Sequence, residues 1–159
     1  MSFLYLLLNL GSLSIPLLYS FEKNMRFIKH WKAVLTSLTI VAAIFLVWDA
    51  IFTKNGVWGF NPDYHLPLLL FGMPIEEWMF FFCIPYASIF IHYSLEYFKP
   101  KLLIPLKVVK IITLLTFVLV VYLAITNTAK AYTFVNYSFL SLVLIVGYKY
   151  GIQHLQRFY

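Results

Sequence analysis

Five long apolar stretches follow one another along the chain, and they restrict its fold more than any other feature of the sequence. They are residues 2–20, 33–52, 74–97, 103–126 and 132–150, and each ends where charged residues, Pro, Asn or Gly collect. A helix needs about 20 apolar residues to cross the hydrocarbon core of a bilayer. Because 11% of the residues are charged, against roughly 25% in soluble domains, a soluble fold is excluded. The sequence predicts an all-α integral membrane bundle of about five transmembrane helices.

Basic residues lie between the apolar stretches and predict how the chain is oriented in the membrane. Four of them fall in residues 21–32 and four in residues 99–110, whereas residues 53–73 contain Lys54 alone. Cytoplasmic connections are enriched in Lys and Arg, so the N-terminus is predicted outside and the C-terminus inside. The net charge of +6 is then explained by basic residues that contact lipid headgroups. No nucleic-acid partner is expected. We expect a multi-pass protein of the cell membrane whose surroundings are the lipid bilayer.

The residue types that usually hold metals and nucleotides form no known motif in this sequence. The four histidines have no metal-ligand spacing, and neither a GxGxxG nor a P-loop sequence is present. Cys83 is the single cysteine and lies in an apolar stretch, where it is expected to pack. The sequence therefore predicts no metal and no cofactor, so the chemistry should be redox-neutral or borrow its cofactor.

Three acidic residues lie in apolar surroundings, where charge is costly and often functional. Asp49 is near the end of the second stretch, and Glu76 and Glu77 open the third in Met73-Pro-Ile-Glu-Glu-Trp78. A Pro followed by acids is also an ordinary helix start, because carboxylates are stabilised at the positive end of the helix dipole. Between apolar neighbours, however, at least one carboxyl should be buried, and burial favours its protonated form. We therefore predict Asp49, Glu76 and Glu77 as catalytic residues.

The predicted helix directions place all three acids toward the same, outer side of the membrane. Adjacent positions on a helix differ by about 100° in direction. One of Glu76 and Glu77 is therefore expected to face the site and the other the membrane interface, with Asp49 as a partner of either.

Aromatic residues are frequent around these acids. The predicted substrate-binding residues are Trp48, Trp58, Phe60, Trp78, Phe81 and Tyr86. A protonated acid surrounded by rings suits the protonation of a carbon–carbon double bond, because ring faces stabilise the resulting cation. The same rings could instead pack the helices, or anchor residues 53–73 as a segment that folds back into the membrane interface. The aromatic residues alone therefore do not identify the reaction.

The motifs around the acids resemble those of one known family. The string Trp48-Asp49-x-x-Phe52-Thr53-x-x-Gly56-Val57-Trp58-Gly59-Phe60-Asn61-Pro62 is followed by Pro74-x-Glu76-Glu77-Trp78-x-Phe80-Phe81 and Pro85-Tyr86. Over about residues 3–98 this joint pattern resembles the lycopene cyclase domain family of membrane-embedded carotenoid cyclases. The resemblance implies an isomerase of the intramolecular lyase type that converts the linear ends of lycopene into β-ionone rings. It also implies that Glu76 and Glu77 are the acid and base, with Asp49 nearby.

The resemblance further implies a domain organisation, because the family usually works as two copies of a three-helix domain. Residues 1–98 would be one such copy, residues 99–130 a linker transmembrane helix, and residues 131–159 the first helix of an incomplete second copy. A weak internal repeat supports this, since Ser2-Phe-Leu-x-Leu-x-Leu-x-x-Gly11 recurs as Ser138-Phe-Leu-x-Leu-x-Leu-x-x-Gly147. No second Pro-x-Glu-Glu segment follows, so a homo-oligomer or a second cyclase subunit is the expected partner.

Two other functions remain open at this stage. In the first, the chain is a non-catalytic carotenoid-binding or assembly subunit, with the glutamates acting as a helix cap and the aromatic residues holding the polyene. In the second, the three acids form the proton relay of a small transporter or channel.

Overall fold

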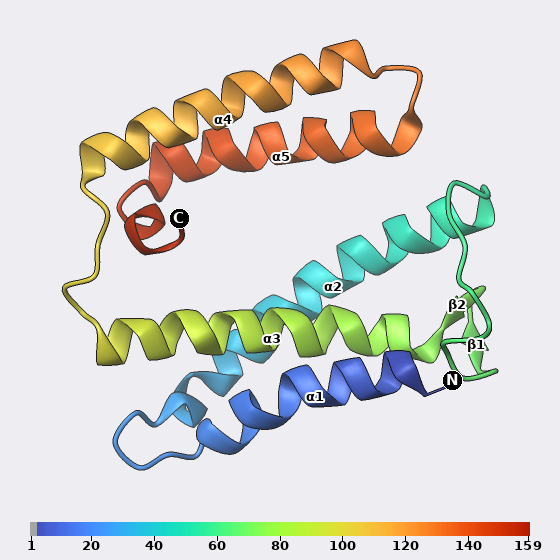
Figure 1. Ribbon diagram of the computed structural model, residues 1–159, viewed down its shortest axis with the longest axis horizontal. Helices are drawn as coiled ribbons and strands as arrows, with labels where there is room; N and C mark the ends of the chain where they lie inside the picture. The colour runs from blue at the N-terminus through green and yellow to red at the C-terminus, as the bar shows by residue number, and fades with distance from the viewer. Residues whose placement is uncertain (1–2) are drawn as a thin grey trace. The chain divides into compact units, whose positions relative to one another are not determined.

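The computed structural model describes residues 3–159, which form five α-helices, two 3-10 helices and one short β-hairpin (Figure 1). The α-helices are α1 (Leu4–Tyr19), α2 (Trp31–Lys54), α3 (Ile75–Phe98), α4 (Leu106–Thr126) and α5 (Ala131–Tyr150). The 3-10 helices are η1 (Phe27–His30) and η2 (His154–Arg157), and the strands are β1 (Leu69–Leu70) and β2 (Met73–Pro74). The chain divides after Phe98 into two compact units.

Helix α3 is the central element of the first unit, because both α1 and α2 pack against it. Contacts in chain order show that α1 and α3 run in the same direction: the start of α1 meets the start of α3, and Ser20 at the end of α1 meets Tyr86. Helix α2 runs the opposite way (Figure 1). The N-terminal ends of α1 and α3 therefore lie beside the C-terminal end of α2.

The connection between α1 and α2 packs against the hydrophobic core of the first unit. Phe27 in η1 is 1% exposed and packs edge-on against Tyr86 and Phe90 of α3. The Tyr86 hydroxyl lies 2.5 Å from the Ser20 hydroxyl and accepts a hydrogen bond from the Trp31 indole at 2.8 Å. This arrangement satisfies the polar atoms of Tyr86 and ties α1, α2 and α3 together away from the acids.

Glu22 organises the turn that precedes η1. Its carboxylate accepts hydrogen bonds from the backbone N–H groups of Met25 at 2.6 Å and Asn24 at 2.9 Å. These two bonds, that of Met25 first, lower the pKa of Glu22 below its usual value. The stabilisation of the turn by these two hydrogen bonds is thus complete above about pH 4.3, the ordinary pKa of glutamate. It is lost as the pH falls through the lowered pKa of Glu22.

We expect Glu22→Ala to increase the rate of amide hydrogen exchange at Asn24 and Met25 at neutral pH, because both amides lose their acceptor. Exchange measured by mass spectrometry on the protein in detergent tests this. Lys23→Ala is the matched control, since the Lys23 side chain is exposed and leaves both hydrogen bonds in place. Equal exchange in the wild type and Glu22→Ala would show that the carboxylate does not hold the turn.

The segment between α2 and α3 ends in an antiparallel β-hairpin. Leu69 pairs with Pro74 and Leu70 with Met73, and the two turn residues Phe71 and Gly72 both have positive φ, 52° and 79°. Two-residue hairpin turns of type I′ need positive φ at both central positions, which Gly adopts freely and a bulky residue rarely adopts. The turn therefore projects Phe71 outward, where it is 74% exposed.

The second unit is a hairpin of α4 and α5 closed by η2. The backbone N–H of Ile104 donates to Gln156 O, and the Gln156 side chain donates back to Ile104 O, both at 2.9 Å. The Arg157 guanidinium donates to Pro100 O at 3.0 Å. No residue of α5 is buried within the unit. Helix α5 packs on α4 and leaves its other apolar faces uncovered, as expected where lipid or another helix covers them.

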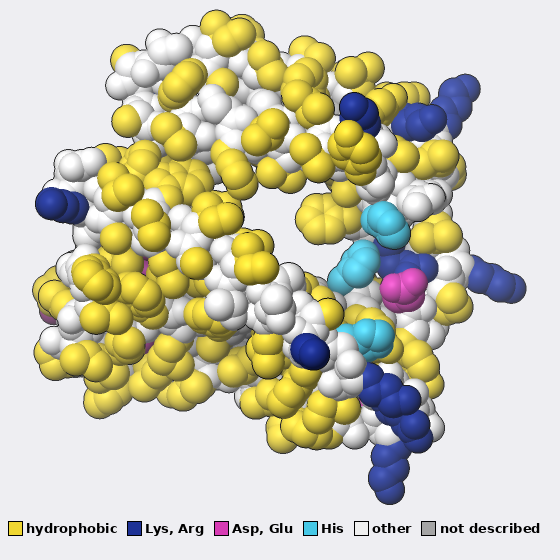
Figure 2. Space-filling view, turned by 180° about the vertical axis from the view of Figure 1, so that it is seen from behind, with side chains coloured by type: hydrophobic (Ala, Val, Ile, Leu, Met, Phe, Trp, Pro, Cys, Tyr) yellow, Lys and Arg dark blue, Asp and Glu magenta, His cyan; other side chains and the backbone are white. Residues whose placement is uncertain are grey.

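The fold class predicted from the sequence is confirmed, since each predicted stretch forms a helix with ends shifted by a few residues. Four segments are long and apolar enough to cross a membrane: Phe27–Lys54, Ile75–Phe98, Leu106–Thr126 and Ala131–Tyr150. Helix α1 is shorter, with 16 residues, and its predicted start at Ser2 lies outside the described residues. Hydrophobic side chains cover most of the face drawn in Figure 2. The outward N-terminus and the incomplete second copy stay predictions.

Candidate functional site

The three acids predicted from the sequence lie at one end of the first unit. Asp49 is in the penultimate turn of α2, and Glu76 and Glu77 are in the first turn of α3. Because α2 and α3 are antiparallel, these two helix ends are neighbours. The start of α1 completes the group with Tyr5. We call Tyr5, Asp49, Glu76 and Glu77 the acid cluster.

Glu77 and Asp49 form a pair of carboxyl groups inside this cluster. The two side chains are in hydrogen-bonding contact with each other, and Asp49 is 6% exposed. Glu77 also accepts a hydrogen bond from the Tyr5 hydroxyl through its Oε2 atom. Asp49 contacts the indole of Trp58 in addition. Two carboxyl groups in contact within apolar surroundings cannot both remain charged without a large electrostatic cost.

Glu76 points into the protein in a different direction and is 0% exposed. Its Oε1 atom accepts a hydrogen bond from the backbone N–H of Leu66 at 2.8 Å, while Oε2 is buried and has no hydrogen-bond partner among residues 3–159. The expectation that one of the two glutamates faces the membrane interface is therefore not met: Glu76 faces the connection before α3, and Glu77 faces Tyr5 and Asp49. Both directions lead inward because α1 and residues 55–74 cover the start of α3.

Asn9 joins α1 to the start of α3. It is 1% exposed, and its Nδ2 group donates to Glu76 O at 3.0 Å and to Tyr5 O at 3.2 Å. Sequence reasoning missed both Tyr5 and Asn9. The available signal was a pair of polar residues four positions apart, on one face of an otherwise apolar helix, where polar side chains commonly bond to a neighbouring helix.

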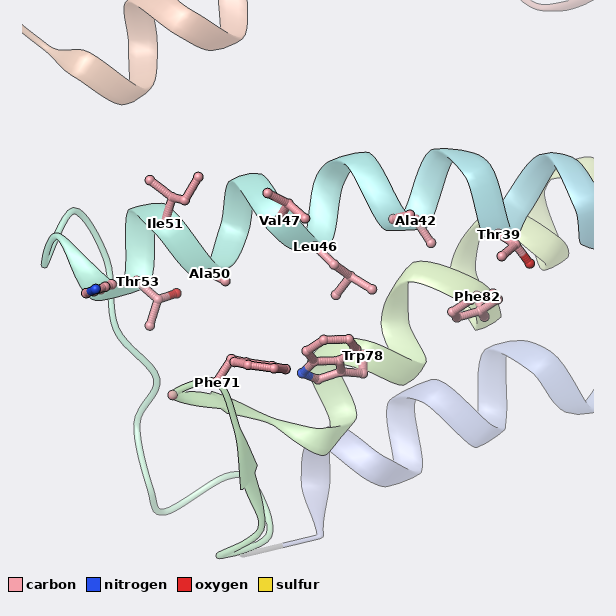
Figure 3. Close-up of a pocket in the computed structure, with 13 residues that line it drawn as sticks. Thr39, Ala42, Leu46, Val47, Ala50, Ile51, Thr53, Phe71, Trp78 and Phe82 are labelled. Carbon is pink, nitrogen blue, oxygen red and sulfur yellow. The ribbon is translucent and has the colours of Figure 1, made fainter.

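An apolar groove runs between α2 and α3 next to the acid cluster (Figure 3). Its volume is about 1120 Å³. The lining residues are Thr39, Ala42, Ala43, Leu46, Val47, Ala50, Ile51, Thr53, Lys54, Phe71, Gly72, Trp78 and Phe82. From Thr39 to Lys54 the groove follows α2 for about 22 Å at 1.5 Å per residue. Phe71 extends from the hairpin toward Trp78, and the two rings are 5.9 Å apart.

Asp49 lies at the edge of this groove, although its side chain is not part of the lining. An α-helix turns by about 100° per residue, so Asp49 lies on the flank of α2. This flank is between the face that carries the groove residues Leu46 and Thr53 and the face opposite to it. The Trp58 indole, which contacts Asp49, also donates a hydrogen bond to Thr53 Oγ1 at 3.0 Å. Trp78 lines the groove and directly follows Glu77. Thr53 is therefore linked to Asp49 through Trp58, and Trp78 is the groove residue next to Glu77 in the chain.

Three of the predicted substrate-binding residues belong to a row of rings on the other side of Asp49. Phe81 stacks on Phe45 at 6.4 Å, Phe45 on Trp48 at 5.4 Å, and Phe52 on Trp58 at 5.2 Å. Trp48 and Phe52 meet edge-on at 5.7 Å and complete the row. The row runs along α2 past Asp49, on the side of α2 that the groove does not reach.

The remaining three predicted residues lie in different places. Trp78 lines the groove, and Phe60 packs with it against the core residues Ala42, Leu46 and Met73. Tyr86 lies in the core around Phe27, two to three turns along α3 from the acids. It lines a second groove of about 170 Å³, which shares Phe82 with the larger groove. The two grooves together follow α2 from Trp31 to Lys54.

Metal binding has no visible site in the part of the chain that the structure describes. Within residues 3–159, no group of three or more His, Cys, Asp or Glu side chains is placed to hold a metal ion. The acid cluster itself consists of carboxyl groups and one phenol, whose ordinary chemistry is proton transfer.

Comparison with known proteins identifies the family. The model of the family described as lycopene cyclase matches residues 2–95, a range that holds α1, α2, the hairpin and all of the acid cluster. No curated protein and no solved structure matches the chain. Since the match covers more than half of the 159 residues, this chain belongs to the lycopene cyclase family.

Proposed function

We propose that this chain catalyses the redox-neutral, acid-catalysed cyclisation of lycopene ends to β-ionone rings, as a lycopene β-cyclase or one half of one. Membership of the family supports carotenoid cyclisation as the general reaction, and four apolar helices support a multi-pass membrane protein. The observation that carries the specific proposal is the Glu77–Asp49 pair, of buried Asp49 and half-buried Glu77, beside a long apolar groove. We place the protein in the cell membrane.

The Glu77–Asp49 pair is the proposed proton donor. Protonating an alkene requires an acid that keeps its proton in a dry site, and a carboxyl pair that shares one proton meets this requirement. The proton goes to the terminal carbon–carbon double bond of the substrate and leaves a tertiary cation. The next double bond attacks that cation, so the carbon–carbon bond of the ring forms and the positive charge moves into the ring.

Loss of a ring proton to a carboxylate then forms the ring double bond. One proton enters and one leaves, so the product is an isomer of the substrate and no oxidant or reductant is needed. After the first step the Glu77–Asp49 pair has lost its shared proton and can accept the departing one. Glu76 stays a predicted participant in this transfer, and it has the further task of holding Leu66 and the connection over α3.

The two grooves are the proposed binding site for the polyene. Together they extend about 35 Å along α2 at 1.5 Å per residue, comparable with the roughly 30 Å of a bilayer core. Their lining is almost entirely apolar, which suits a hydrocarbon that enters from lipid. Trp78 and Tyr86 contact the substrate in this arrangement, while Phe60 supports Trp78. Trp48, Trp58 and Phe81 stay predicted substrate-binding residues; in this arrangement they lie beyond the carboxyl pair, away from the grooves, and keep that side of the pair apolar.

A partner is part of the proposal. The chain carries one Pro-x-Glu-Glu segment, and lycopene has two ends to cyclise. We propose that a second copy of this chain or a second cyclase subunit supplies the other site. The proposed organisation is a catalytic domain of residues 1–98, a linker helix in residues 99–130, and the first helix of a second copy in residues 131–159.

Expression of the chain alone in a lycopene-accumulating bacterium tests the function. We expect γ-carotene or β-carotene in the extracted pigments, separated by chromatography and identified by absorption and mass. A vector without the gene is the control, and membrane insertion is verified by fractionation. Unchanged lycopene with the protein in the membrane would contradict a self-sufficient cyclase. Unchanged lycopene that co-purifies with the protein would favour a carotenoid-binding subunit.

A further inference from the structure

Tyr5 is the one hydroxyl group in contact with the carboxyl pair, among the hydrogen bonds found in residues 3–159. Its hydroxyl donates to Glu77 Oε2, and Glu77 contacts Asp49. Side chains from three different helices are therefore connected by successive contacts. The phenol of α1 contacts the carboxyl group of α3, which contacts the carboxyl group of α2. None of the sequence motifs around the acids includes Tyr5.

The position of Tyr5 is fixed by its own backbone. Its N–H donates to Tyr64 O at 3.0 Å, in the connection before α3. Its carbonyl oxygen accepts a hydrogen bond from Asn9 Nδ2 at 3.2 Å, and the same Nδ2 group donates to Glu76 O. The start of α1 is thus tied both to the connection and to the first turn of α3. A phenol held in this way can keep one orientation toward Glu77.

We propose that Tyr5 is a positioning residue for the Glu77–Asp49 pair. By donating to Oε2 of Glu77, its hydroxyl occupies one carboxyl oxygen and leaves the other for the proton shared with Asp49. The shared proton is then held on the side of Glu77 that faces α2, which is also the side of the groove. This inference rests on the proposed function, but its structural part concerns the carboxyl pair alone and can be measured without substrate.

The geometry distinguishes Tyr5 from a residue that only fills space. A packing tyrosine is replaced by phenylalanine at little cost, because the ring remains. A positioning tyrosine loses its effect when the hydroxyl is removed, because Oε2 of Glu77 is then free to take the proton or to turn away from Asp49. Tyr5→Phe therefore removes the proposed role and leaves the ring in place.

Infrared spectroscopy of the purified protein in lipid nanodiscs reads the carboxyl pair directly. The stretching band of protonated carboxyl groups is first assigned by its loss in Glu77→Gln and Asp49→Asn. We expect Tyr5→Phe to move this band to higher frequency, because a protonated carboxyl that loses a hydrogen-bond donor has a stronger carbonyl bond. Tyr19→Phe is the matched control: it makes the same change in the same helix, where Tyr19 is 58% exposed.

Ring formation is the second measurement. We expect Tyr5→Phe to lower kcat about three- to tenfold with KM little changed, equivalent to roughly 1 kcal/mol of transition-state stabilisation. An unchanged band in Tyr5→Phe, or no band that depends on Glu77 and Asp49, would overturn the positioning role. A shifted band in a protein whose wild type forms no rings would support the positioning role and reject a self-sufficient cyclase.

Discussion

Glu77→Gln is expected to lower ring formation by at least about 100-fold, the usual size of a general acid contribution. Gln has nearly the same shape and can still accept the Tyr5 hydrogen bond, but it cannot carry the transferable proton. The effect should therefore appear in kcat while the protein remains folded. The measurement is the rate of γ- and β-carotene formation in membranes that contain known amounts of each variant.

Glu96→Gln is the control for this prediction. It makes the same change in the same helix, at an exposed position near the other end of α3. Asp49→Asn should reproduce the loss, because in the proposed mechanism both carboxyl groups share the proton. Glu76→Gln tests the predicted part of Glu76 in proton transfer. Because Gln keeps an acceptor for the Leu66 N–H, any loss of rate reports on proton transfer. Normal rates in Glu77→Gln and Glu76→Gln would refute the carboxyl mechanism.

Filling the apolar groove is expected to have the second largest effect. In Ala43→Trp, an indole would occupy the groove between α2 and α3, where Ala43 forms part of the lining. Since a tryptophan buries about 150–250 Å² of surface, it competes with the substrate for the same space. We expect at least a tenfold loss in kcat/KM, or roughly 1.4 kcal/mol, measured with lycopene supplied in liposomes.

Ile44→Trp is the matched control for the filled groove. Ile44 is the next residue of α2, is 59% exposed and takes no part in the lining. A tryptophan there points away from the groove, so the activity should stay within about twofold of the wild type, as for a surface change of about 0.5 kcal/mol or less. If both variants kept full activity, the polyene would have to bind elsewhere, and the row of rings from Phe81 to Trp58 would be the next surface to test.

Many features of the fold follow from local sequence patterns. The lengths of the apolar stretches predicted five helices, because backbone groups in lipid must be satisfied within each segment. The Pro-x-Glu-Glu segment placed two acids at the start of a helix, and α3 begins at Ile75, one residue after the predicted Pro74. Alternating helix directions were enough to bring Asp49 toward the same end as Glu76 and Glu77.

Other features depend on which helix face meets which, and no local pattern encodes that. The two adjacent glutamates were expected to separate into one inward and one outward side chain. Both lie inward because α1 covers one side of α3 and residues 55–74 cover its start. The six aromatic residues likewise appeared equivalent in the sequence, yet they are divided between the groove, the row of rings and the core around Phe27.

The sequence by itself determined that this protein is an all-α membrane bundle with three acids at one end and a family resemblance over its first three helices. The tertiary structure alone decided that Glu77 pairs with Asp49, that Glu76 holds Leu66, and that Tyr5 and Asn9 belong to the same site. The physical reason is the range of the interactions. Helix formation and lipid exposure depend on neighbours a few residues apart, whereas Tyr5 and Glu77 are 72 positions apart and meet only when α1 packs against α3.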